Sequence, residues 1–507
     1  QIMMKKAIKK LLAALLAVAM VCAMAIPAFA YNPGETEEDL NTKHDYGAFQ
    51  IFTGDVSDDN TTISNVGWGE SIPNHEDFLE KLKEDLTIGN QFSNAKTAQD
   101  VLMVISTWDD SDDDSIAFAR FVCKYLYPTA DAKPEPDDTG HTGGFEIRKP
   151  GYYLIVDISP FHEDDFYHAY NSFLLKVTQA NYVFNINYKV VKPTVEKEVH
   201  DNDNNDIGST GGWGSSADHA INEPFQFRLI AKLPASENNG RAYDYYKEYA
   251  VRFNDTLSDG ITFDKLDKVE IANVDGSTPQ VITDTHYKLD EGGLPSSFKL
   301  SIDDVKTCAR AANLDLNKGA TITVTYTAHL NEKAYVNAAG GGTDNKNRVY
   351  LEYSNNPRIS TSLDHTPESE VCVYTYQLNN TKHQDSETGP VLQGAGFRLY
   401  SDKACTQEVK LYQKDNFYFP IKDATDKDKD AVQMISGQDG QFNVKGLDAG
   451  TYYLRETKTP DDYSACPDTE IVISATHDVN NVSLSGNLSN KIINKKAGGI
   501  TLPSTGG

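Results

Sequence analysis

Cysteine, basic residues and enzyme motifs are scarce in this 507-residue chain, and each shortage argues against a class of protein. The six cysteines form no CxxC pair, which disfavours a zinc site, and they are too few for a disulfide-stapled miniprotein. Only 47 basic residues face 74 acidic ones, so nucleic acid and anionic membranes are disfavoured as partners. Because no G-x-S-x-G, HExxH or nucleophile–base constellation is present, we expect a protein that is not an enzyme.

Nothing in the sequence predicts a cofactor or a metal site. Residues 201–206 are rich in oxygen ligands, but Asp206 stands where an EF-hand needs glycine and Gly212 where it needs Glu. This stretch therefore predicts a solvated turn.

Long apolar runs are confined to the beginning of the chain. Four lysines, the last of them Lys10, precede an apolar run from Leu11 to Ala25, and Pro27-Ala28-Phe29-Ala30 follows. A basic region, an apolar region and an A-x-A site are typical of a secretory signal peptide, so we expect cleavage after residues 1–30. The run is short for a bilayer span, which makes a membrane anchor the weaker alternative.

About 477 residues remain after cleavage, enough for three or four domains. Residues 31–190 predict one domain of strands with helical insertions. Its strands are expected at 48–52, 152–156, 173–177 and 182–188, and its helices at 78–86, 95–106 and 116–126.

Alternating β-branched and aromatic residues between turn clusters continue to the end of the chain. They are typical of β-sandwiches, which we expect at 191–365 and 366–496, followed by a linker and tail at 497–507. Residues 144–154 and 440–454 share a weak repeat, which suggests that the first and third domains have a common topology. Strands of the middle domain are expected at 194–199, 225–230, 249–253, 322–326 and 349–353.

The third domain carries an acid, a lysine and an asparagine on three of its expected strands. Glu456 follows Leu454 by two residues and so shares its inward face, where a carboxyl group is costly to ionise and should remain protonated. Lys382 lies where the first strand should run and Asn494 lies on the last. With the segment Leu392–Tyr400, which matches "L-x-G-A-x-F-x-L-Y", this trio resembles the Cna B-type domain of Gram-positive surface proteins. The resemblance implies an isopeptide bond between Lys382 and Asn494, with Glu456 as the proton shuttle.

The middle domain carries a parallel set. Residues 194–199, 254–260 and 347–357 resemble the opening strand, the acid-bearing segment and the closing strand of the Cna A-like, isopeptide-forming domain of shaft pilins. The resemblance implies a bond from Lys197 to Asn347 with Asp255 as the shuttle. Asn345 is the alternative acceptor.

The first domain departs from this pattern. Val156 occupies the position that corresponds to Glu456, and Asp157 is one residue away on the other face. We therefore expect no equivalent crosslink there. Cys405 and Cys466 are candidates for a disulfide in the third domain, a pairing that the sequence leaves open.

The tail, Leu502-Pro503-Ser504-Thr505-Gly506, resembles the LPxTG sorting motif of Gram-positive surface proteins, which a sortase cleaves after the threonine. In that family an apolar span and a basic tail follow the motif, whereas the present sequence stops at Gly507. Residues 183–189 resemble a degraded "VxVYPK" pilin motif without its proline, which makes Lys189 the expected linkage residue and Lys192 its competitor.

Together these features resemble a sortase-assembled backbone pilin. That family implies a mainly β fold of tandem immunoglobulin-like sandwiches, secretion, anchoring to the cell wall and a structural role in the pilus. Its partners would be a sortase, neighbouring pilin subunits and, through the sortase, peptidoglycan, with host-surface ligands left open. The alternative function is a monomeric wall-anchored adhesin or an ancillary pilin, which needs the sorting motif but no linkage lysine.

Overall fold

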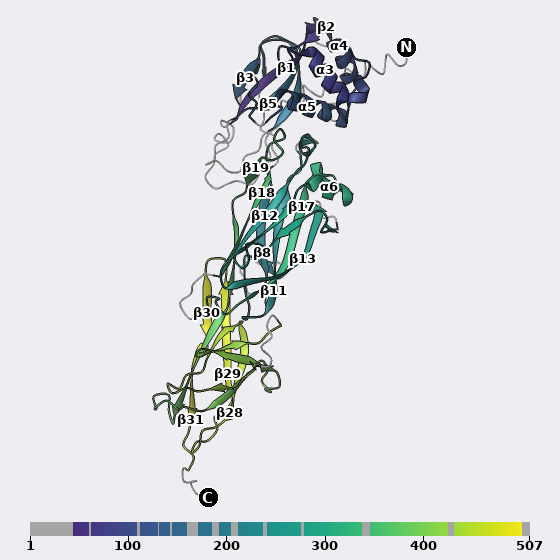
Figure 1. The fold of residues 1–507 in the computed structure, drawn as a ribbon. Helices are drawn as coiled ribbons and strands as arrows, with labels where there is room; N and C mark the ends of the chain where they lie inside the picture. Colours follow the sequence, from purple (N-terminus) through teal and green to yellow (C-terminus); the bar gives the residue numbers. More distant parts are fainter. Residues whose placement is uncertain are drawn as a thin grey trace.

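Three domains follow one another along an elongated rod in the computed structural model (Figure 1). The signal peptide, Lys189 and the sorting motif fall outside the described residues. None of the described helices combines the length and apolar character that a membrane crossing requires. The structure describes residues 44–59, 62–108, 112–129, 131–141, 144–159, 171–184, 192–203, 211–236, 241–274, 278–336, 345–423 and 430–498.

The first domain is a sheet in the order β2-β1-β5-β6, with β3 also pairing β1, covered by helices on one face. The opposite face packs against the two-stranded sheet β4-β7. The bounds are β1 Asp45–Val56, β2 Ile63–Trp68, α3 His75–Glu84, α4 Ala98–Ile105, α5 Asp113–Leu126, β3 Asp138–His141, β4 Phe145–Ile147, β5 Gly151–Asp157, β6 Ser172–Val177 and β7 Tyr182–Phe184.

Alternation along the central strands explains why both faces of this sheet are buried. In β5, Leu154 and Val156 pack under the helices, whereas Tyr153 and Ile155 face the small sheet. The predicted helices and strands of this domain are confirmed, except that residues 185–188 of the last strand lie outside the described residues.

The middle domain is a sandwich of two sheets, in the orders β10-β20-β18-β12-β16-β15 and β14-β13-β17-β11-β8-β9. Their inward side chains form one large apolar core. The bounds are β8 Thr194–His200, β9 Trp213–Gly214, β10 Ser216–Asp218, β11 Pro224–Leu233, β12 Val251–Leu257, β13 Ile261–Asn273, β14 Gln280–Val281, β15 Lys288–Asp290, β16 Ser297–Ile302, α6 Val305–Ala311, β17 Ala320–Leu330, β18 Lys346–Ser354, β19 Leu363–His365 and β20 Ser369–Tyr374.

The boundary expected at residue 365 needs a correction. Strand β20, which begins at Ser369, pairs with β18 and β10 and so completes a sheet of the middle domain. The ladder hydrogen bonds of β20 belong to the sandwich that precedes it, a pairing that local residue pattern does not reveal. The third domain therefore starts with β21 at Tyr376.

The third domain is a second sandwich, with sheets β24-β25-β27-β21-β31 and β23-β22-β28-β29-β30. Its first and last strands, β21 and β31, are parallel neighbours. The bounds are β21 Tyr376–Gln384, β22 Gly396–Tyr400, β23 Glu408–Val409, β24 Leu411–Lys414, β25 Phe417–Pro420, β26 Met434–Ile435, β27 Asn443–Leu447, β28 Gly450–Lys458, β29 Thr469–His477, β30 Val482–Gly486 and β31 Ser489–Asn494.

The middle and third domains share a packed junction. Tyr412 and Phe419 of the third domain belong to the apolar core of the middle domain. The N–H of Ile221 donates to the carbonyl of Gly446 at 2.9 Å. Gly446 has a φ of 83°, and a Cβ there would lie 2.5 Å from the Ile221 side chain, so this contact requires glycine.

Candidate crosslink sites

The strand β8 delivers Lys197 to the interior of the middle domain. Lys197 and Val199 face inward, while Glu196 and Glu198, on either side of Lys197, face outward and pair with basic side chains of β11. The alternation of a strand thus buries the lysine and leaves the acids near solvent. The Lys197 side chain has no exposed surface and its Nζ lies 5.3 Å from the centre of the Phe227 ring.

Three polar groups meet the Lys197 ammonium inside the sandwich. Asp255 on β12 forms an ion pair with it through Oδ2, and the Tyr326 hydroxyl lies 3.2 Å from its Nζ. Tyr326 also donates to Asp255 Oδ1 at 3.3 Å and accepts from Asn347 Nδ2 at 2.5 Å. Lys197 and Asn347 therefore converge on one hydroxyl, and Asp255 stands beside it.

The two asparagines that flank Lys346 have different surroundings. Asn345 is fully engaged, because its Nδ2 donates to the carbonyls of Tyr335 and Val373 and its Oδ1 accepts from the Tyr335 N–H. Asn347 has no exposed surface, and its Oδ1 has no hydrogen-bond partner among the described residues. Only Asn347 presents its amide to the lysine site.

Burial disfavours both charges of the Lys197–Asp255 pair. Desolvation lowers the pKa of Lys197 to about 8, against the opposing effect of Asp255. Desolvation likewise raises the pKa of Asp255, although Lys197 counteracts it. The pair can therefore pass a proton from lysine to carboxylate at low cost, which produces a neutral amine beside a neutral acid.

The third domain brings together Lys382, Asn494 and Glu456. Lys382 lies on the inward face of β21 and Asn494 ends the adjacent parallel strand β31; neither has exposed surface. Lys382 Nζ donates directly to Asn494 Oδ1. From the opposite sheet, Glu456 Oε1 accepts from Asn494 Nδ2 at 2.7 Å.

The motif segment around Phe397 forms the apolar floor of this site. Phe397 lies opposite Glu456 in the ladder between β22 and β28, and its ring centre is 5.6 Å from Lys382 Nζ. It also stacks on Phe442 at 4.4 Å. The match to "L-x-G-A-x-F-x-L-Y" thus has a physical basis, because the aromatic residue desolvates the lysine and positions the acid strand.

The environment of Glu456 differs from the apolar core position that the sequence predicts. It is half-buried, and its Oε2 accepts from the backbone N–H of Cys466 at 2.8 Å. Both of its oxygens accept from N–H groups, so the residue lies at the margin of the core where polar partners compensate it. Desolvation lowers the pKa of Lys382, with Cys466 and Glu456 acting in the opposite direction.

The candidate disulfide between Cys405 and Cys466 is not formed in this structure, where both residues are free thiols. Cys405 Sγ lies 3.8 Å from Asp468 Oδ2 at the surface. Cys466 contacts Glu456 and Lys382 instead, and burial raises the pKa of its thiol to about 11. The two thiols have different neighbours.

In the first domain, Asp157 does not meet a lysine. It is buried and pairs with His44 Nδ1 at 2.6 Å, while Val156 packs into the apolar core. No lysine in the described part of residues 44–184 is buried.

The competing linkage lysine, Lys192, lies just before β8 and is half-buried. Lys189 and the sorting residues Leu502, Pro503, Ser504, Thr505 and Gly506 lie outside the described residues.

Sequence reasoning missed two members of these sites. Tyr326 lies on β17 within an ordinary alternating strand, and Cys466 lies in the loop before β29. Neither position carries a local signal, since each side chain reaches its site only through long-range packing.

One family model matches part of the third domain. Residues 378–487 match the family model described as SpaA: Prealbumin-like fold domain. No curated protein matches the chain.

Solved structures similar to the chain are Gram-positive major or backbone pilins. The T6 backbone pilin of Streptococcus pyogenes is 15% identical over 90% of this chain and 97% of its own, with a TM-score of 0.47. The major pilin SpaD of Corynebacterium diphtheriae is 21% identical over 73% and 87%, with a TM-score of 0.41. The 35 kDa C-terminal fragment of the major pilin GBS80 of Streptococcus agalactiae is 21% identical over 60% and 99%, with a TM-score of 0.42. The matched segment 378–487 contains Lys382 and Glu456.

Proposed function

We propose that this chain is a structural subunit of a covalently polymerised cell-surface pilus, braced by two internal Lys–Asn isopeptide bonds. The observation that carries the proposal is that two buried lysines, Lys197 and Lys382, each share a site with an asparagine and an acid, in successive sandwich domains of a rod. A buried lysine without such a purpose is costly, because the charged amine loses its hydration.

The chemistry in the third domain follows from the contacts. Neutral Lys382 Nζ attacks Cγ of Asn494, a C–N bond forms, and the bond from Cγ to Nδ2 breaks. Glu456, hydrogen-bonded to Nδ2, transfers the proton that the lysine releases to the departing nitrogen, which leaves as ammonia. Atoms balance as one amine plus one primary amide giving one secondary amide and ammonia.

The middle domain performs the same step between Lys197 and Asn347. Asp255 is the proton shuttle, and the Tyr326 hydroxyl, in contact with all three, aligns the amide with the amine. Asn345 is not the acceptor in this proposal, because its amide is committed to backbone groups.

Intact mass spectrometry of the secreted chain tests the crosslinks. Each bond removes one ammonia, about 17 Da, so we expect two such losses. Asn347→Ala and Asn494→Ala should each abolish one loss, whereas Asn345→Ala should keep both. An unshifted wild-type mass would refute the crosslinks.

We further propose that a sortase joins Thr505 of one subunit to Lys189 of the next, with Lys192 as the competing acceptor. Incubation with the pilin sortase should give a ladder that survives boiling in detergent and disappears in Lys189→Ala. A ladder lost only in Lys192→Ala would reassign the acceptor. No ladder with the wild-type chain would favour the alternative, a monomeric wall-anchored adhesin.

A further inference from the structure

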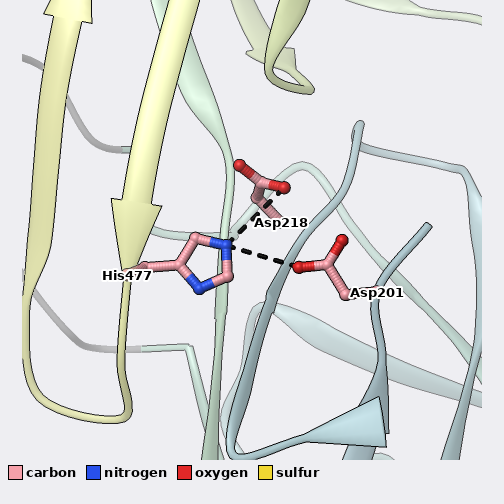
Figure 2. A group of neighbouring side chains, drawn as sticks. All are labelled: Asp201, Asp218 and His477. Atoms are coloured by element: carbon pink, nitrogen blue, oxygen red, sulfur yellow. Dashed lines mark ion pairs between the residues drawn. The ribbon is translucent and has the colours of Figure 1, made fainter. Parts of the chain in front are cut away.

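Three buried ionisable side chains from two domains meet at the junction of the middle and third domains (Figure 2). Asp201 directly follows β8, Asp218 ends β10, and His477 ends β29 of the third domain. Each is at most 1% exposed, and their ligand atoms lie within 4.8 Å of one another. The turn predicted to be solvated at 201–206 thus begins with a buried carboxylate.

The outer atoms of these side chains are held by hydrogen bonds. Asp218 Oδ2 accepts from the Tyr376 hydroxyl at 2.7 Å, and Asp201 Oδ1 accepts from the N–H of Asp203 at 3.0 Å. Ser216 Oγ lies 2.8 Å from His477 Nδ1. Such contacts to the outer atoms orient Asp201 Oδ2, Asp218 Oδ1 and His477 Nε2 toward a common point, as partners of ligating residues do in metal sites.

The spacing of the inner atoms fits ligands around an ion better than hydrogen bonds. His477 Nε2 lies 3.5 Å from Asp201 Oδ2 and 3.7 Å from Asp218 Oδ1. An N–H···O bond is about 2.7–3.2 Å long. Two ligands bound tetrahedrally at about 2.0–2.1 Å would be about 3.4 Å apart.

An independent observation also points to a ligand. Asp201 Oδ2 is buried, has no hydrogen-bond partner among the described residues, and is directed toward His477. Burying an uncompensated carboxylate oxygen is costly.

We propose that Asp201, Asp218 and His477 bind a divalent transition-metal ion, of which Zn²⁺ is the best fit, and that this ion clamps the middle domain to the third. One imidazole nitrogen and two carboxylate oxygens are ligands that Zn²⁺ accepts, whereas Ca²⁺ prefers oxygen alone. The clamp adds to the junction made by Ile221 and Gly446. It does not depend on the crosslinks or on sortase.

Metal binding to the mature chain, stripped with a chelator and then dialysed, tests this clamp. Titration calorimetry with ZnCl₂ and elemental analysis should give one Zn²⁺ per chain, and the unfolding temperature should rise with added Zn²⁺. CaCl₂ at the same concentration should give no comparable heat. Absence of stoichiometric Zn²⁺, or binding of Ca²⁺ in preference to Zn²⁺, would overturn the assignment.

Matched variants localise the ion. His477→Ala and Asp201→Asn should each weaken Zn²⁺ binding at least tenfold. Asp201→Asn nearly preserves the shape of the side chain, so it still tests the site if His477→Ala fails to fold. The control His286→Ala removes a histidine from a loop of the middle domain and should leave the affinity unchanged. Full affinity in both site variants would refute the site.

Discussion

The two lysine sites use the same three functional groups in different arrangements. In the middle domain the acid and the amide share a sheet, on neighbouring strands β12 and β18, and Lys197 reaches them from the opposite sheet. In the third domain the lysine and the amide share a sheet, on β21 and β31, and Glu456 reaches them from across the core. A bond in the first case joins two sheets, and in the second it joins two neighbouring strands.

This difference has a mechanical consequence. Because β21 and β31 are parallel and adjacent, tension along the rod would shear them past each other, and a Lys382–Asn494 bond would carry that load directly. A Lys197–Asn347 bond would instead prevent the two sheets from separating. Both bonds would remove the long segments between their ends from the path of the force.

The sites also differ in enclosure. The middle site is sealed, with no exposed surface on Lys197 or Asp255, whereas Glu456 is half-buried. Solvent can therefore replace a missing partner in the third domain but not in the middle domain. The following predictions test this contrast.

Removal of the lysines should give the largest difference. Lys197→Ala and Lys382→Ala each lose a crosslink worth about 4–5 kcal/mol in the chain-entropy model. Lys197→Ala should lose about 1–3 kcal/mol more, because it also leaves the buried Asp255 carboxyl without the amide N–H that takes the place of the ammonium in the crosslinked chain. Calorimetric unfolding of the variants measures the stability of each of the two domains.

Asn347→Ala and Asn494→Ala are the controls for that comparison, since they remove the crosslinks but keep both the lysine and the acid of each site. The destabilisation by these two variants should be more nearly equal. Equal losses for the two lysine variants would contradict the enclosure argument.

Replacement of the acids should give the second-largest difference between the two sites. Asp255→Asn should stop bond formation in the middle domain, because no water can reach the site to move the proton. Glu456→Gln should slow the bond in the third domain without abolishing it. A time course of intact mass after purification measures both, and the reverse order of effects would contradict the prediction.

A pH effect should follow from the lowered pKa of Lys382. In an uncrosslinked Asn494→Ala variant, the unfolded chain binds more protons than the folded one between that lowered pKa and the ordinary value of about 10.4. The free energy of unfolding should therefore rise with pH across this window. The double variant with Lys382→Met should lack this rise, and parallel pH curves would refute the desolvation.

The cysteines should have the smallest effect. Cys466→Ala keeps the backbone N–H that Glu456 accepts, so the crosslink should still form and stability should change by less than about 1 kcal/mol. Cys405→Ala with Cys466→Ala should run as the wild type in non-reducing gels. If the double variant migrates differently from the wild type, and adding reductant moves the wild type to the same position, the wild type contains a disulfide.

Local pattern was sufficient for much of the fold. The alternation of Val195, Lys197 and Val199 against Glu196 and Glu198 identifies the inward face of β8 without further information, because side chains of a strand alternate between its faces. The helical spacing at 78–86 and 116–126 likewise predicted α3 and α5.

The choice between Asn345 and Asn347, in contrast, needed the tertiary structure. Asn345 directly precedes β18 and Asn347 is its second residue, and only long-range contacts with Tyr335 and Val373 occupy one amide and leave the other to the lysine site. The boundary at β20 was also misjudged, because strand pairing is a long-range property.

The residue pattern alone was enough to place Lys197 and Lys382 in the opening strands of their domains, and Leu454 and Glu456 on one face of a strand, since side chains alternate along a β-strand. Which of these groups meet depends instead on how the sheets and the domains pack. Tyr326 joins Lys197 to Asn347, Cys466 lies beside Lys382, and His477 reaches Asp201 from another domain. The reason is physical: each meeting depends on how two sheets or two domains pack, and no local pattern encodes that distance.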